Sequence, residues 1–235
     1  MAFRFKQFSV EDQQSTMRVG SDAVLLGAWA RVAEDSHMLE IGTGCGVISL
    51  MLAQRSTARI DAIEIDEPSF LQAQENFAAS PWNQRLHPIL ISLQEFTRNT
   101  IEKYDHILTN PPFFRNSLKS PDPVKNSTKH ESLLTFEDIL HSAIRLLDRY
   151  GKLSLILPPK EGQLFTGMAA GMELFLTRET EISPKSGKPV NRKLLEFSFI
   201  PPSHFISDQL TIRLDDNAYT DEYREFTAPY YFSLK

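Results

Sequence analysis

A tetrapeptide with groups suited to hold an amino nitrogen, Asn110-Pro111-Pro112-Phe113, directly follows the apolar run of residues 104–109. Because proline fixes φ and lacks a backbone N–H, the segment is stiff and its carbonyl oxygens stay free as acceptors. The Asn110 side-chain oxygen and the Pro111 carbonyl could accept both N–H groups of a planar amine, leaving its lone pair aimed at an electrophilic methyl group. Phe113 would stack on the ring that carries the amine. Taken alone, the tetrapeptide also fits an ordinary strand-ending Pro-Pro turn with one buried aromatic.

A glycine-rich turn lies upstream, between a short apolar strand and a helix-like stretch. It spans residues 42–46, with glycine at Gly42, Gly44 and Gly46. Glycine lets the backbone turn sharply and lets a ligand lie against main-chain N–H groups at the start of a helix. The spacing G-x-G-x-G fits neither the dinucleotide fingerprint G-x-G-x-x-G nor the phosphate loop G-x-x-x-x-G-K-[ST]. A nucleotide pyrophosphate is therefore not the expected ligand.

An acid at the end of the next predicted strand completes the pattern. Glu64 and Asp66 close the run that begins at Ile60. A carboxylate beside the glycine loop could accept hydrogen bonds from both hydroxyls of a ribose, and Glu64 is the first choice for this role, with Asp66 as the alternative. Each acid alone is an ordinary solvated strand end, but the order of loop, acid and tetrapeptide favours one site that joins them.

These motifs resemble those of the class I methyltransferases that use S-adenosylmethionine, in the amino-methylating branch with an [Asn/Asp/Ser]-Pro-Pro-[Tyr/Phe/Trp] motif. The resemblance covers residues from about 16 to about 200. Within that branch the chain is similar to the bacterial tRNA adenine-N6 methyltransferases that modify the base 3′ to the anticodon of a valine tRNA. Residues 17–30, residues 39–55 and the total length carry this closer match.

The resemblance implies S-adenosyl-L-methionine as cofactor and a direct in-line transfer of its methyl group to adenine N6. The catalytic residues would be Asn110, Pro111, Pro112 and Phe113. The cofactor-binding residues would be Asp22, Glu40, Gly42, Thr43, Gly44, Gly46, Glu64 and Asn110. One position departs from the family, because many relatives meet the cofactor adenine with an acid where this chain has Ser92. No metal is expected, and the scattered histidines show no ligand spacing.

The hydrophobic pattern predicts alternating strands and helices, which is typical of an α/β protein with a mostly parallel sheet. The predicted strands span residues 38–41, 60–65, 87–91, 104–109 and 152–157, with a closing hairpin over 174–182 and 193–200. The predicted helices span 47–55, 68–79, 133–150 and 161–172, and Thr135 and Gly151 are expected to begin and end the third. Short extra strands are expected near residues 3–8 and 209–214. The resemblance implies a Rossmann-like class I methyltransferase fold with a seven-stranded sheet and an antiparallel closing strand.

With 235 residues, 41% of them hydrophobic, the chain can bury a substantial core in one domain. We expect a single methyltransferase domain over 1–235, with a cofactor-covering segment over about 1–35, a catalytic core over about 36–200 and an extension over about 201–235. The single cysteine, Cys45, excludes an internal disulfide framework and is interpreted as a small residue at a tight turn. Neither a signal peptide nor a membrane span is expected, and the cytoplasm is the expected compartment.

The net charge of −5 argues weakly against a nucleic-acid partner, but the cations are unevenly placed. One group, directly after the tetrapeptide, includes Arg115, Lys119, Lys129 and His130. The other, residues 183–193, has four cations and no acid, and it includes Lys185, Lys188 and Arg192. Both groups could face the carboxyl ends of the strands and form a basic rim for RNA phosphates, although Lys-rich loops are also ordinary solvated surface. This placement favours an RNA partner, and the resemblance implies that the RNA is a tRNA, the valine acceptor, with no obligate protein partner.

Other interpretations remain open from the sequence. Guanine N2 of ribosomal RNA and the side-chain amide of a glutamine in a translation factor present the same planar NH2 group. A DNA adenine is less favoured, because the chain has no evident domain for reading duplex sequence. A non-catalytic RNA-binding module with a decayed methyltransferase fold would have a damaged glycine loop or a replaced Asn110, and both are intact.

Overall fold

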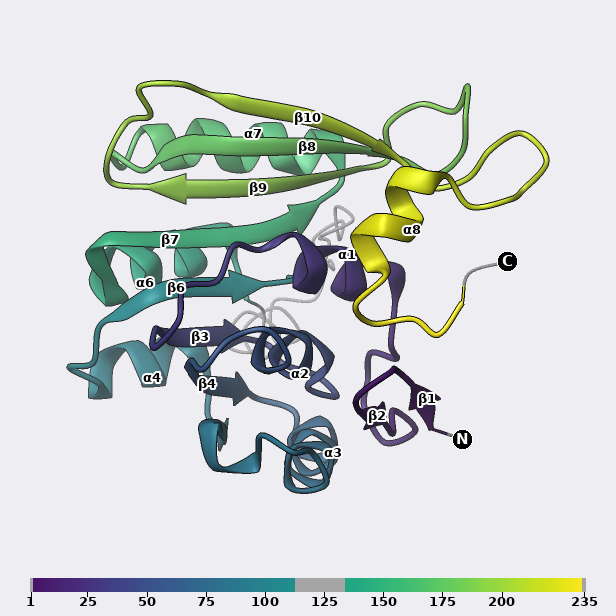
Figure 1. Cartoon of the computed structure of the whole chain (residues 1–235). Helices are drawn as coiled ribbons and strands as arrows, with labels where there is room; N and C mark the ends of the chain where they lie inside the picture. Colours follow the sequence, from purple (N-terminus) through teal and green to yellow (C-terminus); the bar gives the residue numbers. More distant parts are fainter. Residues whose placement is uncertain (1, 113–133, 234–235) are drawn as a thin grey trace, which may run out of the picture.

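Strands and helices alternate along the chain, as the hydrophobic pattern predicted, in a computed structural model that describes residues 2–112 and 134–233 (Figure 1). The strands are β1 (Phe3–Arg4), β2 (Ser9–Val10), β3 (His37–Ile41), β4 (Arg59–Glu64), β5 (Leu86–Leu90), β6 (Tyr104–Thr109), β7 (Leu147–Leu157), β8 (Phe175–Ser183), β9 (Arg192–Ser198) and β10 (Ile206–Thr211). The helices are α1 (Ser21–Trp29), α2 (Val47–Ala53), α3 (Glu67–Ala78), α4 (Leu93–Asn99), α6 (Phe136–Leu146), α7 (Pro159–Ala170) and α8 (Asp221–Thr227), with a 3₁₀ turn η1 (Asn83–Arg85).

The main sheet has the strand order β10-β8-β9-β7-β6-β3-β4-β5. Strand β9 runs antiparallel to both of its neighbours, and all other adjacent strands run parallel. This confirms the predicted mostly parallel sheet with an antiparallel closing strand. Within the described residues the sheet has eight strands, one more than predicted, because β10 pairs with β8 at the edge. Strands β1 and β2 form a separate two-stranded sheet.

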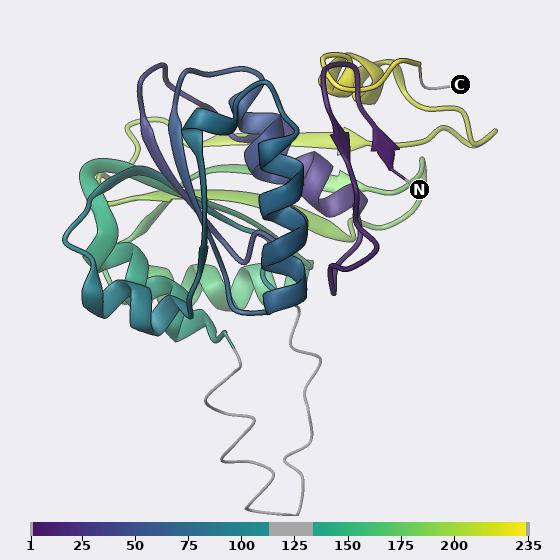
Figure 2. The same ribbon diagram turned by 90° about the horizontal axis from the view of Figure 1, so that it is seen from below.

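Helices cover both faces of the sheet, and each face has its own apolar core (Figure 2). One core joins α1, α2 and α3 to the sheet through buried side chains such as Leu25, Leu50 and Phe77. The other joins α6 and α7 to the sheet, with Ile139 and Phe165 fully buried. Because both faces are covered, the central strands are mostly apolar, and the polar side chains inside them, such as Glu40, Asp61 and His106, are buried.

The predicted helix over residues 133–150 is shorter than expected. Helix α6 begins after Thr135, whose side chain forms a capping box with Asp138, as the sequence indicated. The helix ends at Leu146, and the chain enters β7 at the next residue. Gly151 therefore lies inside a strand, where an added Cβ would stand 2.7 Å from the Tyr104 carbonyl oxygen. This glycine permits close strand contact and does not end the helix.

The two ends of the described chain lie on the same side of the molecule, the N-terminal end at β1 and the C-terminal end near α8 (Figure 1). The Lys6 N–H donates to the Tyr230 carbonyl at 2.8 Å, and the Tyr230 hydroxyl donates to the Met51 carbonyl at 3.2 Å. Near the amino terminus, Phe5 stacks on Phe8 and on Tyr231. The C-terminal segment is thus fastened to the N-terminal segment and to α2. None of the described helices is long and apolar enough to span a bilayer.

Candidate functional site

Three strand ends bring the predicted site residues together. Ile41, the last residue of β3, pairs with Thr109 at the end of β6 and with Ile63 near the end of β4. The Thr109 hydroxyl also donates to the Ile41 carbonyl at 3.0 Å, which fixes the two ends side by side. Gly42 and Asn110 follow directly on these ends, and Glu64 closes β4. Residues far apart in the sequence therefore meet at one edge of the sheet, as its parallel order predicts.

The glycine loop depends on backbone torsions that other residues rarely adopt. Gly42, Gly44 and Gly46 have φ angles of +70°, +55° and +83°. A Cβ on Gly46 would also collide with the ring of Phe77 in α3, whereas a Cβ on Gly42 would meet no atom within 4 Å. The space over Gly42 is therefore open to a ligand, and Gly46 provides the close contact between the loop and α3.

The main-chain N–H groups of this loop are already engaged within the protein. Gly42 and Thr43 both donate to the Ile63 carbonyl, at 2.9 and 3.1 Å, and Gly46 donates to the Thr43 carbonyl at 2.8 Å. The Gly44 N–H donates to the Glu64 carboxylate at 2.9 Å. The loop thus differs from the sequence expectation, because these four N–H groups hold its own shape and it offers a ligand mainly space.

Glu64 braces the loop while keeping part of its acceptor capacity. Its second carboxylate oxygen accepts the N–H groups of Ile65 and Asp66, at 2.8 and 3.0 Å. A carboxylate has about four acceptor positions, and three are used here, so roughly one remains for a ribose hydroxyl. Asp66, the alternative for this role, caps α3 by accepting both the N–H and the hydroxyl of Ser69.

Glu40 lies behind the loop and is almost fully buried. One carboxylate oxygen accepts the Thr43 hydroxyl at 2.8 Å, the Ser49 N–H at 3.0 Å and the Ser49 hydroxyl. Burial raises the pKa of Glu40 to about 7, because the lost hydration outweighs the hydrogen bonds that favour its charged form. Glu40 was predicted to bind the cofactor. In the structure its carboxylate joins Thr43 of the loop to Ser49 in the first turn of α2.

Asn76 of α3 joins the glycine loop to the N-terminal segment, a contact that the sequence analysis missed. Its side-chain amide donates to the carbonyls of Cys45 and Glu11, at 2.8 and 2.7 Å, and its oxygen accepts the Glu11 N–H. The Ser15 hydroxyl stands 3.5 Å from where a Cβ of Gly44 would lie, so this segment covers the loop. The partners of Asn76 are 31 and 65 positions away in the sequence, so no local sequence pattern could predict these contacts.

A small cavity of about 60 Å³ opens between the ends of β3, β4 and β5. Its walls include Gly42, Glu64, Ile65, Ile91 and Ser92. The volume itself is far smaller than a nucleoside, but the lining chemistry, apolar side chains with one carboxylate, is of the kind that binds a base joined to a ribose. The Ser92 hydroxyl accepts the Glu95 N–H at 3.2 Å and so caps α4.

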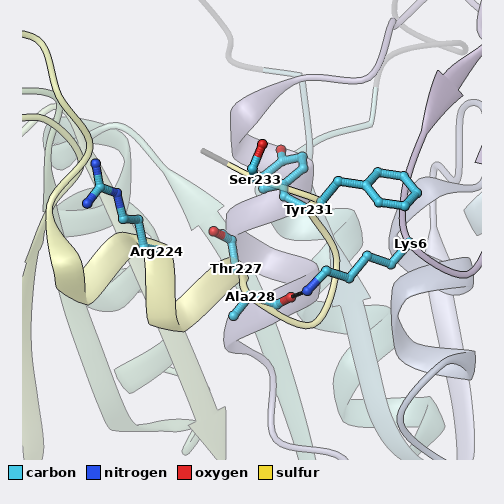
Figure 3. Close-up of a pocket in the computed structure, with 7 residues that line it drawn as sticks. Lys6, Arg224, Thr227, Ala228, Tyr231 and Ser233 are labelled. Carbon is cyan, nitrogen blue, oxygen red and sulfur yellow. Dashed lines mark hydrogen bonds between the residues drawn. The ribbon is translucent and has the colours of Figure 1, made fainter. Parts of the chain in front are cut away.

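A larger cavity, of about 520 Å³, lies between the N- and C-terminal segments (Figure 3). Lys6 and Arg224 line it together with Tyr231 and Phe232, and Lys6 donates to the Ala228 carbonyl. It contains no predicted site residue. We place the candidate site at the smaller cavity, because the converging polar groups, and not the volume, determine what chemistry is possible.

The predicted RNA-contacting cations of the hairpin lie at the same edge of the sheet. Strand β8 runs parallel to β7, because β9 is antiparallel to both, so the loop after Ser183 joins the carboxyl ends of the parallel strands. Lys185 donates to the Asn217 side chain at 3.0 Å, and Lys188 is exposed. Neither lysine has an acidic partner among the residues that the structure describes.

The other two cations of this segment are paired with acids. Arg192 donates from Nε to the Asp22 carboxylate at 2.7 Å, which joins a predicted RNA contact to a predicted cofactor contact. Lys193 lies 3.0 and 2.9 Å from carboxylate oxygens of Glu179 and Glu181.

Several predicted site residues fall outside the described part of the chain. They are Phe113, Arg115, Lys119, Lys129 and His130. Of the tetrapeptide, Asn110 is half-buried, Pro111 is buried and Pro112 is exposed. Residues 2–112 and 134–233 contain no group of three or more metal-ligating side chains. The Cys45 thiol is buried, and burial raises its pKa to about 12, which fits its interpretation as a packing residue.

Comparisons with known proteins agree on one class. The family model described as the methyltransferase small domain matches residues 15–169. A protein of Flavobacterium johnsoniae, named tRNA1(Val) (adenine(37)-N6)-methyltransferase, is 41% identical over 99% of this chain and 100% of its own length. A protein of the same name from Phocaeicola vulgatus is 42% identical over 99% of this chain and 98% of its own length.

A solved structure supports the fold alone. The crystal structure of a predicted O-methyltransferase from Agrobacterium tumefaciens matches with a TM-score of 0.68 and 18% identity, over 88% of this chain and 96% of that one. The expected Rossmann-like methyltransferase architecture is thereby confirmed.

The buried Glu40 carboxyl should make stability depend on pH in a particular direction. Its pKa is about 7 in the folded chain against an ordinary value of 4.5, so between these values the folded state binds more protons than the unfolded state. The free energy of unfolding of the wild type should therefore fall as pH rises through this window. Glu40→Gln removes the titration, and its stability relative to wild type should rise across the window by up to about 3 kcal/mol. Urea unfolding at about pH 5 and about pH 8 measures this, and parallel profiles for the two proteins would contradict it.

Proposed function

The chain belongs to the methyltransferase small domain family and, within it, to the tRNA1(Val) (adenine(37)-N6)-methyltransferases, and we propose that it methylates N6 of the adenine beside the anticodon of a valine tRNA. Its cofactor is S-adenosyl-L-methionine. The observation that carries the proposal is the meeting of Asn110, Gly42 and Glu64 at adjacent strand ends, in a chain 41% identical to a relative of that name. A tRNA substrate would place this work in the cytoplasm.

The residues around the small cavity fit the cofactor. Glu64 keeps roughly one acceptor position for a ribose hydroxyl, while Ile65 and Ile91 offer apolar faces to a base. The open space over Gly42 would admit the part of the ligand that runs toward Asn110. When bound, the cofactor supplies an electrophilic sulfonium methyl group. Other predicted cofactor residues would border the bound cofactor. They are Asp22 in α1 and Thr43, Gly44 and Gly46 in the glycine loop.

Asn110 and Pro111 would act on the amine by position. The Asn110 side-chain oxygen and the Pro111 carbonyl would each accept one N–H of the adenine amine, so that the nitrogen lone pair points toward the methyl group. An amine that has received the methyl group would be positively charged and therefore acidic. Its proton can pass to water, so no protein base is needed. Phe113 would stack on the adenine ring, and Pro112 would keep the turn stiff.

Lys185 and Lys188 would contribute to binding of the RNA backbone. Both lie at the sheet edge that carries the site, without acidic partners in the described residues. Arg115, Lys119, Lys129 and His130 would add to this rim from the segment after the tetrapeptide. The base beside an anticodon is unpaired, so little energy is needed to turn it into a pocket.

Methyl transfer to unmodified tRNA tests the proposed function. Purified protein incubated with labelled S-adenosyl-L-methionine and unmodified total tRNA should yield N6-methyladenosine confined to one valine acceptor. Nucleoside analysis of the separated tRNA identifies the product. Label in ribosomal RNA or in a protein fraction, with tRNA unlabelled, would replace the substrate by guanine N2 or a glutamine amide. A protein that binds tRNA without transfer to any of these would be a non-catalytic module.

Asn110→Ala should lower kcat by a factor on the order of 100 to 1,000, because the amine loses one of its two acceptors. The Kd for the cofactor product S-adenosylhomocysteine, measured by calorimetry, should change little. Asn110→Asp is the matched control, because it keeps a side-chain oxygen at the same place and should retain part of the activity. Full turnover by the alanine variant would show that Asn110 does not hold the amine.

Glu64→Ala should raise the Kd for S-adenosylhomocysteine by a factor on the order of 10 to 100, because the ribose acceptor and the brace on Gly44 are lost together. Asp66→Ala is the control, and it should lower stability by about 1 kcal/mol through loss of the α3 cap. Its cofactor affinity should stay within about twofold of wild type. The reverse result would move the ribose contact to Asp66.

A further inference from the structure

An ion pair joins two segments that the sequence analysis assigned to different ligands. Arg192, the first residue of β9, donates from Nε to Oδ2 of Asp22 at 2.7 Å, across 170 positions of sequence. Both side chains are largely shielded, with 27% of Arg192 and 19% of Asp22 exposed. A short pair of this kind is more favourable than a fully exposed one, because solvent screens it less.

The pair lies where it can position the cofactor-covering part of the chain. Asp22 is in the first turn of α1, directly after the segment whose Ser15 lies over Gly44. Helix α1 packs on α2, which begins at the end of the glycine loop, through buried side chains such as Leu26 and Met51. Holding the start of α1 therefore holds two elements that border the loop, while Figure 1 shows α1 beside the end of the sheet where β9 begins.

The same pair makes Arg192 a poor phosphate contact. Its guanidinium already faces a carboxylate, so a phosphate approaching it would meet the negative charge of Asp22 as well. Its neighbour Lys193 is likewise bound between Glu179 and Glu181. Lys188, in contrast, is exposed and has no acidic partner in the described residues. The cations of residues 183–193 thus divide into structural ones and ones available to RNA.

We propose that Arg192 is a positioning residue for the cofactor site, acting through Asp22, and that it is not an RNA contact. It holds the start of α1, and with it the segment over the glycine loop, against the end of β9. This inference rests on the proposed function, because it assigns a role at the cofactor site of that enzyme. It separates Arg192 from Lys188, which the sequence pattern had grouped together.

Cofactor and RNA affinities measured separately test the proposal. Arg192→Ala should raise the Kd for S-adenosylhomocysteine, measured by calorimetry without RNA, by about 5- to 30-fold, while the dependence of tRNA affinity on salt stays as in wild type. Lys188→Ala is the matched control, and it should leave the Kd for S-adenosylhomocysteine within about twofold and lower the salt slope of tRNA binding by roughly one. Arg192→Lys keeps the charge but not the Nε geometry and should lie between wild type and Arg192→Ala.

A double-mutant cycle tests whether Arg192 acts through Asp22. In an Asp22→Ala background, Arg192→Ala should raise the Kd for S-adenosylhomocysteine by less than about twofold further. Independent, multiplying effects would overturn the proposal, and so would an Arg192→Ala protein with normal cofactor affinity, whatever its tRNA binding. If Arg192→Ala does not fold, judged by thermal unfolding, Arg192→Lys carries the test, and wild-type cofactor affinity in that variant overturns the proposal. If the wild-type protein does not methylate tRNA, the proposed substrate is rejected, but the measurement of cofactor affinity still tests the role of Arg192.

Discussion

Two buried carboxylates, Glu40 and Glu64, hold the glycine loop, and the rest of the site depends on that loop. Its glycines adopt left-handed torsions that only a closed set of hydrogen bonds can keep in one arrangement. Glu40 supplies these bonds from behind, through Thr43 and Ser49, and Glu64 supplies them from the side. Because burial disfavours the charged form of Glu40, the protein accepts an electrostatic cost at this point in exchange for a rigid loop.

Parallel strand pairing turns this local rigidity into a site. The pairing of Ile41 with Thr109 and Ile63 fixes the register of the strand ends, since a slip of one residue would move every side chain of the strand to the opposite face and disrupt both cores. The polar residues that follow the strands therefore keep fixed relative positions although they are far apart in sequence. The local pairing of charges also matters more than the net charge. An acidic protein can attract RNA phosphates wherever some of its cations have no acidic partner.

The sequence alone predicted the elements that local patterns determine. Periodicity located β3, β4, β5 and β6 to within about two residues, and Thr135 indicated the start of α6, but β7 begins at Leu147 and not at the predicted residue 152. The pattern overextended that helix, because Leu146 and Leu147 continue its apolar spacing although the chain turns into β7 there. The roles of Asn76 and Arg192 could not be predicted, since each depends on a partner brought near only by the fold. The sequence analysis grouped Arg192 with Lys188 because both are cations of one segment. The charge of a segment does not show which of its cations are paired with acids elsewhere in the fold.

Because Cys45 is buried, its reactivity toward thiol reagents reports how often the glycine loop opens. It is the only thiol in the sequence, it sits between Gly44 and Gly46, and its carbonyl is held by Asn76. Because Cys45 is 2% exposed, a thiol reagent reaches it only when the structure around the loop opens, so the rate of alkylation measures such openings, as amide exchange does for a backbone N–H. A ligand that seats on the loop would slow the reaction without touching the sulfur. The motion of the site can thus be followed in the unaltered protein, with no label added.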